Sequence, residues 1–213
     1  MTAPVRALVL VDVQQEYVGG PLEIQHPPHA ESLPQVVRAI DAATEAGLVV
    51  VAVQHSSGEG AGVFDPTTER YRLHPDVEAR RTDDWLGAVK QFGSVFAGTD
   101  VLDRLRERGV DTVTFVGYMT NNCILASAAE SEALGLHAEV LSDATGAIHL
   151  ANEAGEVDAR TLHTTLMTLL HSNFAAVATT AAWCDAVAAG TALPGSDLGS
   201  SAGEGLRKAE NPA

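Results

Sequence analysis

The chain has 213 residues, of which 46% are hydrophobic and 19% are charged, values that suit one globular α/β domain with a substantial core. Its net charge of −15 opposes binding to nucleic acid or to an anionic membrane, because phosphates would be repelled. The two cysteines are far apart, which argues against a disulfide framework. No apolar run reaches membrane-spanning length and no segment is typical of a signal peptide, so we expect a cytoplasmic location.

Strand-like and helix-like segments alternate along the chain. Apolar runs predict strands at residues 7–13, 48–54, 89–92, 113–116, 137–141 and 174–178. Helix-forming runs predict helices at residues 33–46, 101–108 and 156–171, a fourth from residue 124 to the glycine at 135, and a short one ending at residue 189. Ser32 is the expected N-cap of the first helix. This alternation implies parallel strand pairing and a sheet covered by helices on both faces.

Three segments carry no regular pattern. Residues 14–31 and 55–84 contain several glycines and prolines, and a loop as long as the second usually covers or lines a binding site. From residue 190 onward Gly, Ser, Ala and Pro dominate and no apolar period survives, which predicts disorder. The sequence therefore predicts one domain at residues 1–189 and a disordered tail at residues 190–213.

Reactive side chains lie near the ends of four predicted strands. Asp12 ends the first strand, His55 follows the second, Lys90 lies in the third, and Cys123 follows the fourth. Sites in parallel sheets form beyond the carboxyl ends of the strands, so Asp12, Lys90 and Cys123 could meet there. Cys123 would be the nucleophile, Asp12 would take its proton, and Lys90 would stabilise both anions.

Cys123 stands where a strand gives way to a helix. Gly117 breaks the apolar run, and helix formers begin directly after Cys123, which indicates a strand, a tight turn and a helix. Unpaired N–H groups and the helix dipole favour a thiolate there, so we expect the pKa of Cys123 to lie below about 8.5. The alternative is that Cys123 is a small buried hydrophobe, as many lone cysteines are.

Three short motifs occur in order along the chain. They are Val-Asp-Val-Gln at 11–14, Lys90 with Gly-Ser-Val-Phe following, and Gly-Tyr-Met-Thr-Asn-Asn-Cys at 117–123. With them, residues 7–178 resemble the isochorismatase-like cysteine hydrolases, which include nicotinamidases, N-carbamoylsarcosine amidases, ureidoacrylate amidases and streptothricin hydrolase. The resemblance implies a three-layer αβα sandwich with a six-stranded parallel sheet.

The same resemblance implies a set of functional residues. Asp12, Lys90 and Cys123 would form a catalytic triad. A cis peptide between Tyr118 and Met119 would direct the Met119 N–H, together with that of Cys123, into an oxyanion hole. The reaction implied is hydrolysis of a C–N bond in a small amide, lactam or ureido compound through a thioester.

Two other functions stand beside this hypothesis. Isochorismatase-type hydrolases of vinyl ethers use the Asp and Lys but typically lack the cysteine, so Cys123 argues against that activity. A non-enzymatic binding member of the family would not require Asp, Lys and Cys together. The acidic composition also raises the hypothesis of a cationic substrate.

Four residues are candidates for substrate binding: Gln14, His55, Tyr118 and Trp85. His55 could instead be a metal ligand or an ordinary loop residue. Nicotinamidases hold a metal ion with an Asp-x-His pair after the second strand, but here the sequence is Val53-Gln54-His55, so we expect no metal and no other cofactor. The expected partners are a small-molecule substrate and further copies of the chain in a homo-oligomer, a dimer or tetramer.

Overall fold

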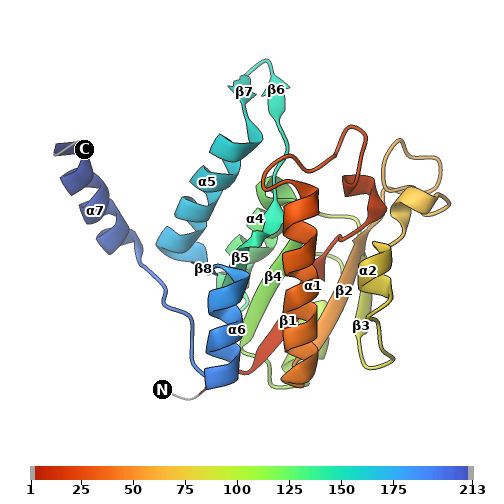
Figure 1. The fold of residues 1–213 in the computed structure, drawn as a ribbon, viewed down its shortest axis with the longest axis horizontal. Coiled ribbons are helices and arrows are strands. Elements are labelled where there is room, and N and C mark those ends of the chain that lie inside the picture. Colours follow the sequence, from red (N-terminus) through yellow and green to blue (C-terminus); the bar gives the residue numbers. More distant parts are fainter. Residues whose placement is uncertain (1–2, 211–213) are drawn as a thin grey trace.

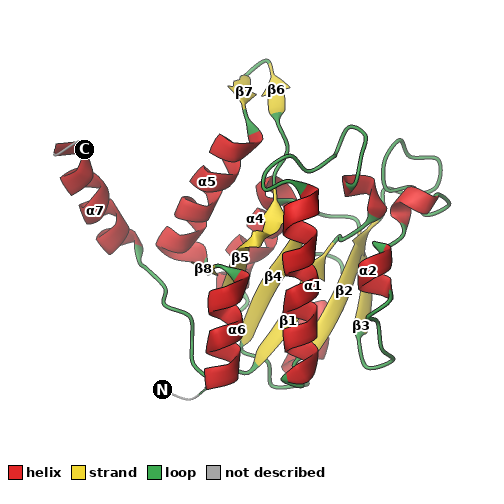
Figure 2. Cartoon of the chain, in the orientation of Figure 1, coloured by secondary structure: helices red, strands yellow, loops and turns green. Residues whose placement is uncertain are grey.

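Six parallel strands form the central sheet in the computed structural model, which describes residues 3–210. They are β1 (Arg6–Val11), β2 (Val49–His55), β3 (Leu86–Lys90), β4 (Thr112–Tyr118), β5 (His137–Gly146) and β8 (Ala176–Ala178), in the spatial order β3-β2-β1-β4-β5-β8. Strands β2 and β3 lie on one side of β1, and β4, β5 and β8 follow on its other side. Figures 1 and 2 show helices in front of and behind this sheet.

Helices cover both faces because successive side chains of a strand point in opposite directions. Leu8 and Leu10 of β1 pack in one core with α1 (His29–Glu45) and α6 (Thr180–Ala189), which lie in front of the sheet in Figure 1. Val9 and Val11 pack in a second core with α3 (Val101–Arg106), α4 (Leu125–Ala133) and α5 (Ala159–Leu169). The expected three-layer αβα sandwich is confirmed, and the two cores explain why β1 is apolar throughout.

Two predicted helices have different boundaries in the structure. The first begins at His29 after Pro28, so Ser32 is not its N-cap; the Ser32 hydroxyl lies inside the helix and bonds to the Tyr118 hydroxyl at 2.9 Å. Residues 156–171 do not form one helix. A hairpin of β6 (Leu150–Asn152) and β7 (Gly155–Val157) comes first, and α5 begins after Asp158, whose carboxylate caps the helix N-terminus.

The long stretch at residues 55–84 contains two short helices, η2 (Glu69–Tyr71) and α2 (Pro75–Glu78). The third strand starts and ends earlier than predicted, since β3 covers Leu86–Lys90. No helix formed by residues 3–210 has the length and apolar character needed to cross a bilayer.

The tail predicted to be disordered, residues 190–213, contains a helix, and its residues 211–213 lie outside the described residues. Residues Leu198–Glu210 form helix α7, which stands apart from the sheet beside α5 in Figure 1. The Asp197 carboxylate accepts hydrogen bonds from the Ser200 N–H at 2.9 Å and its hydroxyl at 2.6 Å, which caps the first turn. The sequence analysis missed this N-cap because the surrounding glycines and serines are typical of a disordered segment.

A buried ion pair fastens the N-terminal end of the sheet to α6. The Arg6 guanidinium contacts Glu139 through Nε and Nη2, at 3.0 Å and 2.8 Å, and both side chains are almost fully buried. Glu139 also accepts hydrogen bonds from Thr114 Oγ1 at 2.7 Å and from the Trp183 indole at 3.1 Å. Trp183 therefore anchors α6 on the sheet.

We expect Glu139→Gln to lower the free energy of unfolding by about 3–5 kcal/mol, because it leaves the buried Arg6 charge without an opposite charge beside it. Urea unfolding followed by circular dichroism would measure this. The matched control is Glu69→Gln, which removes an exposed pair with Arg72 and should cost less than about 1 kcal/mol. Equal, small losses in both variants would contradict a stabilising role for the buried pair.

Candidate active site

Asp12, Lys90 and Cys123 come together at the carboxyl edge of the sheet. The Lys90 ammonium lies 2.6 Å from Asp12 Oδ2 and 3.2 Å from Cys123 Sγ. The three side chains come from the ends of β1, β3 and β4, which are brought together by the parallel pairing of the strands. All three are nearly enclosed, with 2% exposure at Cys123 and less at the others.

The backbone turns sharply at Asp12. Its φ angle is +48°, in the left-handed region that Asp adopts more readily than most non-glycine residues. Its N–H still bonds to Val53 O at 3.0 Å, which continues the pairing of β1 with β2, while its carbonyl accepts the Gln14 N–H at 2.6 Å. The turn directs the chain away from the sheet and leaves the carboxylate at the strand end.

Gly117 is required by the close approach of β4 to β1. Its φ angle is +104°, and a Cβ at this position would lie 2.2 Å from the carbonyl oxygen of Val11. The Tyr118–Met119 peptide that follows is cis. Cys123 then lies in a wide turn, η3 (Thr120–Ile124), which runs directly into α4. The expected sequence of strand, tight turn and helix is therefore present, with η3 between β4 and the α-helix.

Lys90 has two further polar neighbours. Its Nζ lies 3.1 Å from His55 Nδ1 and 3.2 Å from the carbonyl oxygen of Phe92. Burial and the Lys90 charge lower the pKa of His55 to about 4, so its imidazole is neutral and accepts from the ammonium. The Phe92 carbonyl was missed by sequence reasoning, because a backbone acceptor leaves no signal in residue identity.

The electrostatics differ from the expectation for Cys123. Burial, followed by the negative charge of Asp12, raises the pKa of the Cys123 thiol to about 12, and Lys90 only partly opposes this. The predicted lowering of the thiol pKa is therefore wrong for the resting site. Burial also raises the pKa of Asp12 to about 6, against the attraction of Lys90. The carboxylate is thus a stronger base than an exposed aspartate and is held next to a protonated thiol.

Two substrate-binding candidates, Gln14 and Tyr118, make hydrogen bonds within the fold. The Gln14 side chain donates to the carbonyls of His55 and Tyr71 and accepts the His55 N–H, so its amide joins the end of β2 to the loop. The Tyr118 ring is fully buried, and its hydroxyl is bonded to Ser32. These contacts favour packing and backbone support over contact with substrate.

Trp85 lies at the wrong end of its strand for a pocket residue. It directly precedes β3, whose first residue Leu86 pairs with Val51 near the middle of β2, whereas Lys90 pairs with His55 at the carboxyl edge. Five residues of extended strand separate Trp85 from Lys90, or about 16 Å. This separation from Lys90 does not favour a contact of Trp85 with substrate, and the predicted contact remains untested.

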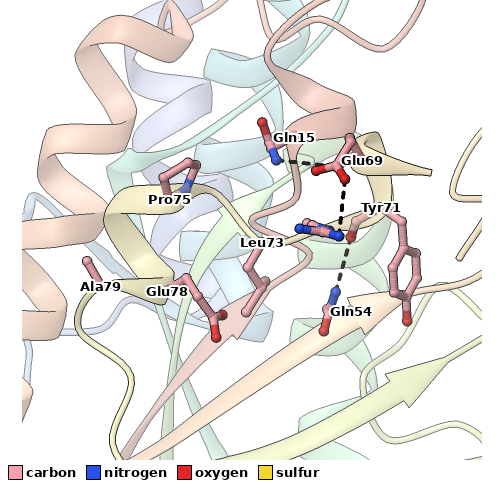
Figure 3. A pocket seen from close by; sticks show the side chains of 9 residues that line it. Gln15, Gln54, Glu69, Tyr71, Leu73, Pro75, Glu78 and Ala79 are labelled. Atoms are coloured by element: carbon pink, nitrogen blue, oxygen red, sulfur yellow. Dashed lines mark hydrogen bonds and ion pairs between the residues drawn. The ribbon is translucent and has the colours of Figure 1, made fainter. Parts of the chain in front are cut away.

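A surface hollow of about 630 Å³ lies beside the end of β2. Figure 3 shows Gln54 reaching the backbone of Tyr71, and Gln15 reaching that of Glu69, across this hollow. Its lining contains none of the three clustered residues. The Gln14 side chain lies between the hollow and the cluster of Asp12, Lys90 and Cys123, since it bonds to the backbone of both His55 and Tyr71.

The donor set around the site does not suit a bound metal ion. Among residues 3–210, no group of three or more His, Cys, Asp and Glu side chains is arranged to hold one. His74 lies beside His29, with 5.6 Å between ring centroids, and not beside His55. Metal independence remains a prediction that needs an activity measurement.

The isochorismatase domain model matches residues 6–182, which is most of the chain. The chain belongs to the isochorismatase family. This isochorismatase-family hydrolase is 39% identical to a solved protein from Burkholderia xenovorans LB400 that is provisionally called an isochorismatase. That match covers 98% of this chain and 99% of the other, with a TM-score of 0.94.

Two further proteins similar to this chain are named as a hydrolase and an amidase. Streptothricin hydrolase of Streptomyces noursei is 32% identical over 126 residues, which cover 59% of this chain and 48% of the relative. The structure of N-carbamoylsarcosine amidase from Thermoplasma acidophilum has a TM-score of 0.66 at 21% identity, covering 84% of this chain and 97% of the other. At that identity the likeness concerns the fold alone.

Proposed function

We propose that this protein is a cysteine hydrolase that cleaves a C–N bond of a small amide, lactam or ureido compound through a thioester. The observation that carries the proposal is the position of the Lys90 ammonium, between the Asp12 carboxylate and the Cys123 sulfur in an enclosed site. A buried acid, a buried cation and a thiol in contact are costly to a fold, and nucleophilic catalysis gives them a purpose.

In the first half of the reaction, Sγ of Cys123 bonds to the substrate carbonyl carbon as Asp12 takes the thiol proton. The carbonyl oxygen becomes an oxyanion, which the N–H groups of Met119 and Cys123 would stabilise. The C–N bond then breaks, and Asp12 gives its proton to the departing nitrogen. Because the pKa of the free thiol is high, proton transfer and attack have to occur together.

The second half releases the acid. Asp12 takes a proton from a water molecule whose oxygen attacks the thioester carbon, and the C–S bond breaks. The thiolate recovers the proton from Asp12. Lys90 stabilises whichever of the two groups is negative in each step, since it contacts both.

The test is a screen for release of ammonia or amine from primary amides, lactams and ureido acids. The net charge of −15 and the match to streptothricin hydrolase favour including basic lactams in the panel. Turnover of a vinyl ether in place of all C–N substrates would support the isochorismatase-type alternative, and binding without turnover would support the non-enzymatic one.

The pH dependence should report the ionisation of Asp12. Its pKa is raised to about 6, and only the ionised carboxylate can take the thiol proton. We therefore expect kcat/KM to rise about tenfold per pH unit below pH 6 and to level off above it. Initial rates with an uncharged amide would measure this. A rate that climbs instead through pH 8–9, as for a free thiol ionising with a pKa of about 8.5, would contradict Asp12 as the base.

Chelators should leave the activity unchanged. The oxyanion can be stabilised by backbone N–H groups, so the proposed mechanism has no step that needs a metal ion. Rates before and after prolonged dialysis against a chelator would test this. Loss of activity that zinc, manganese or iron restores would overturn the prediction.

A further inference from the structure

Helix α7 has very little packing within its own chain. Leu198–Glu210 contains no buried residue, and the helix approaches the rest of the chain mainly at η4 (Leu170–Phe174), the turn that ends α5. Figure 1 shows α7 beside α5, apart from the sheet and the other helices. A hollow of about 440 Å³ lies on the exposed side of α5. It is lined by Thr164, Thr165, Thr168, Leu169 and Ser172.

This part of the molecule carries several of its exposed large apolar side chains. Leu169 is 42% exposed, Leu198 63% and Leu206 67%. On α7, Leu198, Ala202, Leu206 and Ala209 recur at helical spacing and form one apolar stripe. The partly covered residues of α7, Ser201 and Glu204, lie on another side of the helix. The stripe therefore does not face its own chain.

A helix of this composition is not expected to be stable alone. Thirteen residues are too few for a firm helix in water, and three of them are the destabilising residues Gly199, Gly203 and Gly205. The family model ends at residue 182, before α7. Nevertheless the solved Burkholderia protein matches 98% of this chain, which includes most of α7. A shared helix that buries nothing in its own chain requires a contact elsewhere.

We propose that α7 and the exposed side of α5 form a two-fold interface with a second copy of this chain. The apolar stripe of each α7 packs on the hollowed side of α5 in the other copy, which buries the exposed leucines of both. The surfaces are self-complementary, so the contact closes as a dimer. Charge also favours this contact. The chain as a whole carries −15, but on α7 the two acidic residues Glu204 and Glu210 are matched by Arg207 and Lys208, so two copies would not repel each other through α7.

The test compares two matched double variants of the full chain by sedimentation equilibrium. Wild type should have a mass of twice 22.2 kDa or a multiple of that dimer. Leu198→Glu/Leu206→Glu should raise the dimer Kd by at least about 100-fold. Val5→Glu/Val18→Glu adds the same charge at positions that are 46% and 45% exposed outside α5 and α7, and should remain dimeric.

Hydrogen exchange gives a second, independent measurement. The α7 amides should be protected in the wild-type dimer and lose protection in the α7 variant, while the core strands stay protected in both. A wild type that is monomeric at every concentration would overturn the proposal, whether or not α7 is protected. So would a dimer that both double variants leave intact, because the interface would then lie elsewhere.

Discussion

Cys123→Ala should lower kcat for the C–N substrate by about 10⁴-fold or more, because the alanine has no atom that can form the thioester. Among residues 3–210, Cys123 supplies the only thiol or hydroxyl hydrogen-bonded to the Lys90 ammonium, whose other such partners include the His55 ring and the Phe92 carbonyl. Intact-protein mass spectrometry of wild type with a slowly released substrate should show the mass of the acyl group added to the chain. The variant should show no addition.

Cys184→Ala is the matched control. Cys184 is the other cysteine of the chain, is half-buried on α6, and is not among the neighbours of Lys90. This variant should keep wild-type kcat and form the same acyl adduct. Retained hydrolysis in Cys123→Ala, or an adduct on Cys184, would exclude the proposed nucleophile.

Lys90→Met should lower kcat by about 10²–10³-fold, the usual effect of removing one charge that stabilises an anionic transition state. Methionine has a similar length and no charge. The Lys90 charge is the largest influence that lowers the pKa of Asp12, so its loss should also move the acid limb of kcat/KM to higher pH. Measuring kcat and the pH profile together separates this effect from a general loss of structure.

Lys208→Met removes the other lysine of the chain, which is exposed on α7, and should change neither kcat nor the pH profile. An acid limb that stays near pH 6 in Lys90→Met would contradict the electrostatic coupling of Lys90 to Asp12. A large loss of helix signal would instead show that the buried ion pair is needed for folding.

Much of the site could be read from the sequence, because it is built from strand ends. Asp12 directly follows the apolar strand β1, and Cys123 lies in the turn that follows β4; parallel pairing brings both strand ends to one edge. The motif residues Lys90 and Gly117 added the third member and the turn. The strand and helix pattern predicted a parallel sheet covered on both faces, and the family resemblance implied the αβα sandwich and the grouping of Asp12, Lys90 and Cys123, whose contact the structure contains.

Only the tertiary structure decided which groups surround that contact and how they are charged. Burial is a property of the whole fold, and it raises the pKa of Cys123 although helix position and Lys90 suggested the reverse. Strand register placed Trp85 away from the site, and long-range contacts assigned Gln14 to the backbone of β2 and the loop. The sequence by itself determined which reactive side chains lie near the strand ends, because local patterns set where strands end. Contacts between segments far apart in the chain determined how buried these side chains are and which groups lie beside them.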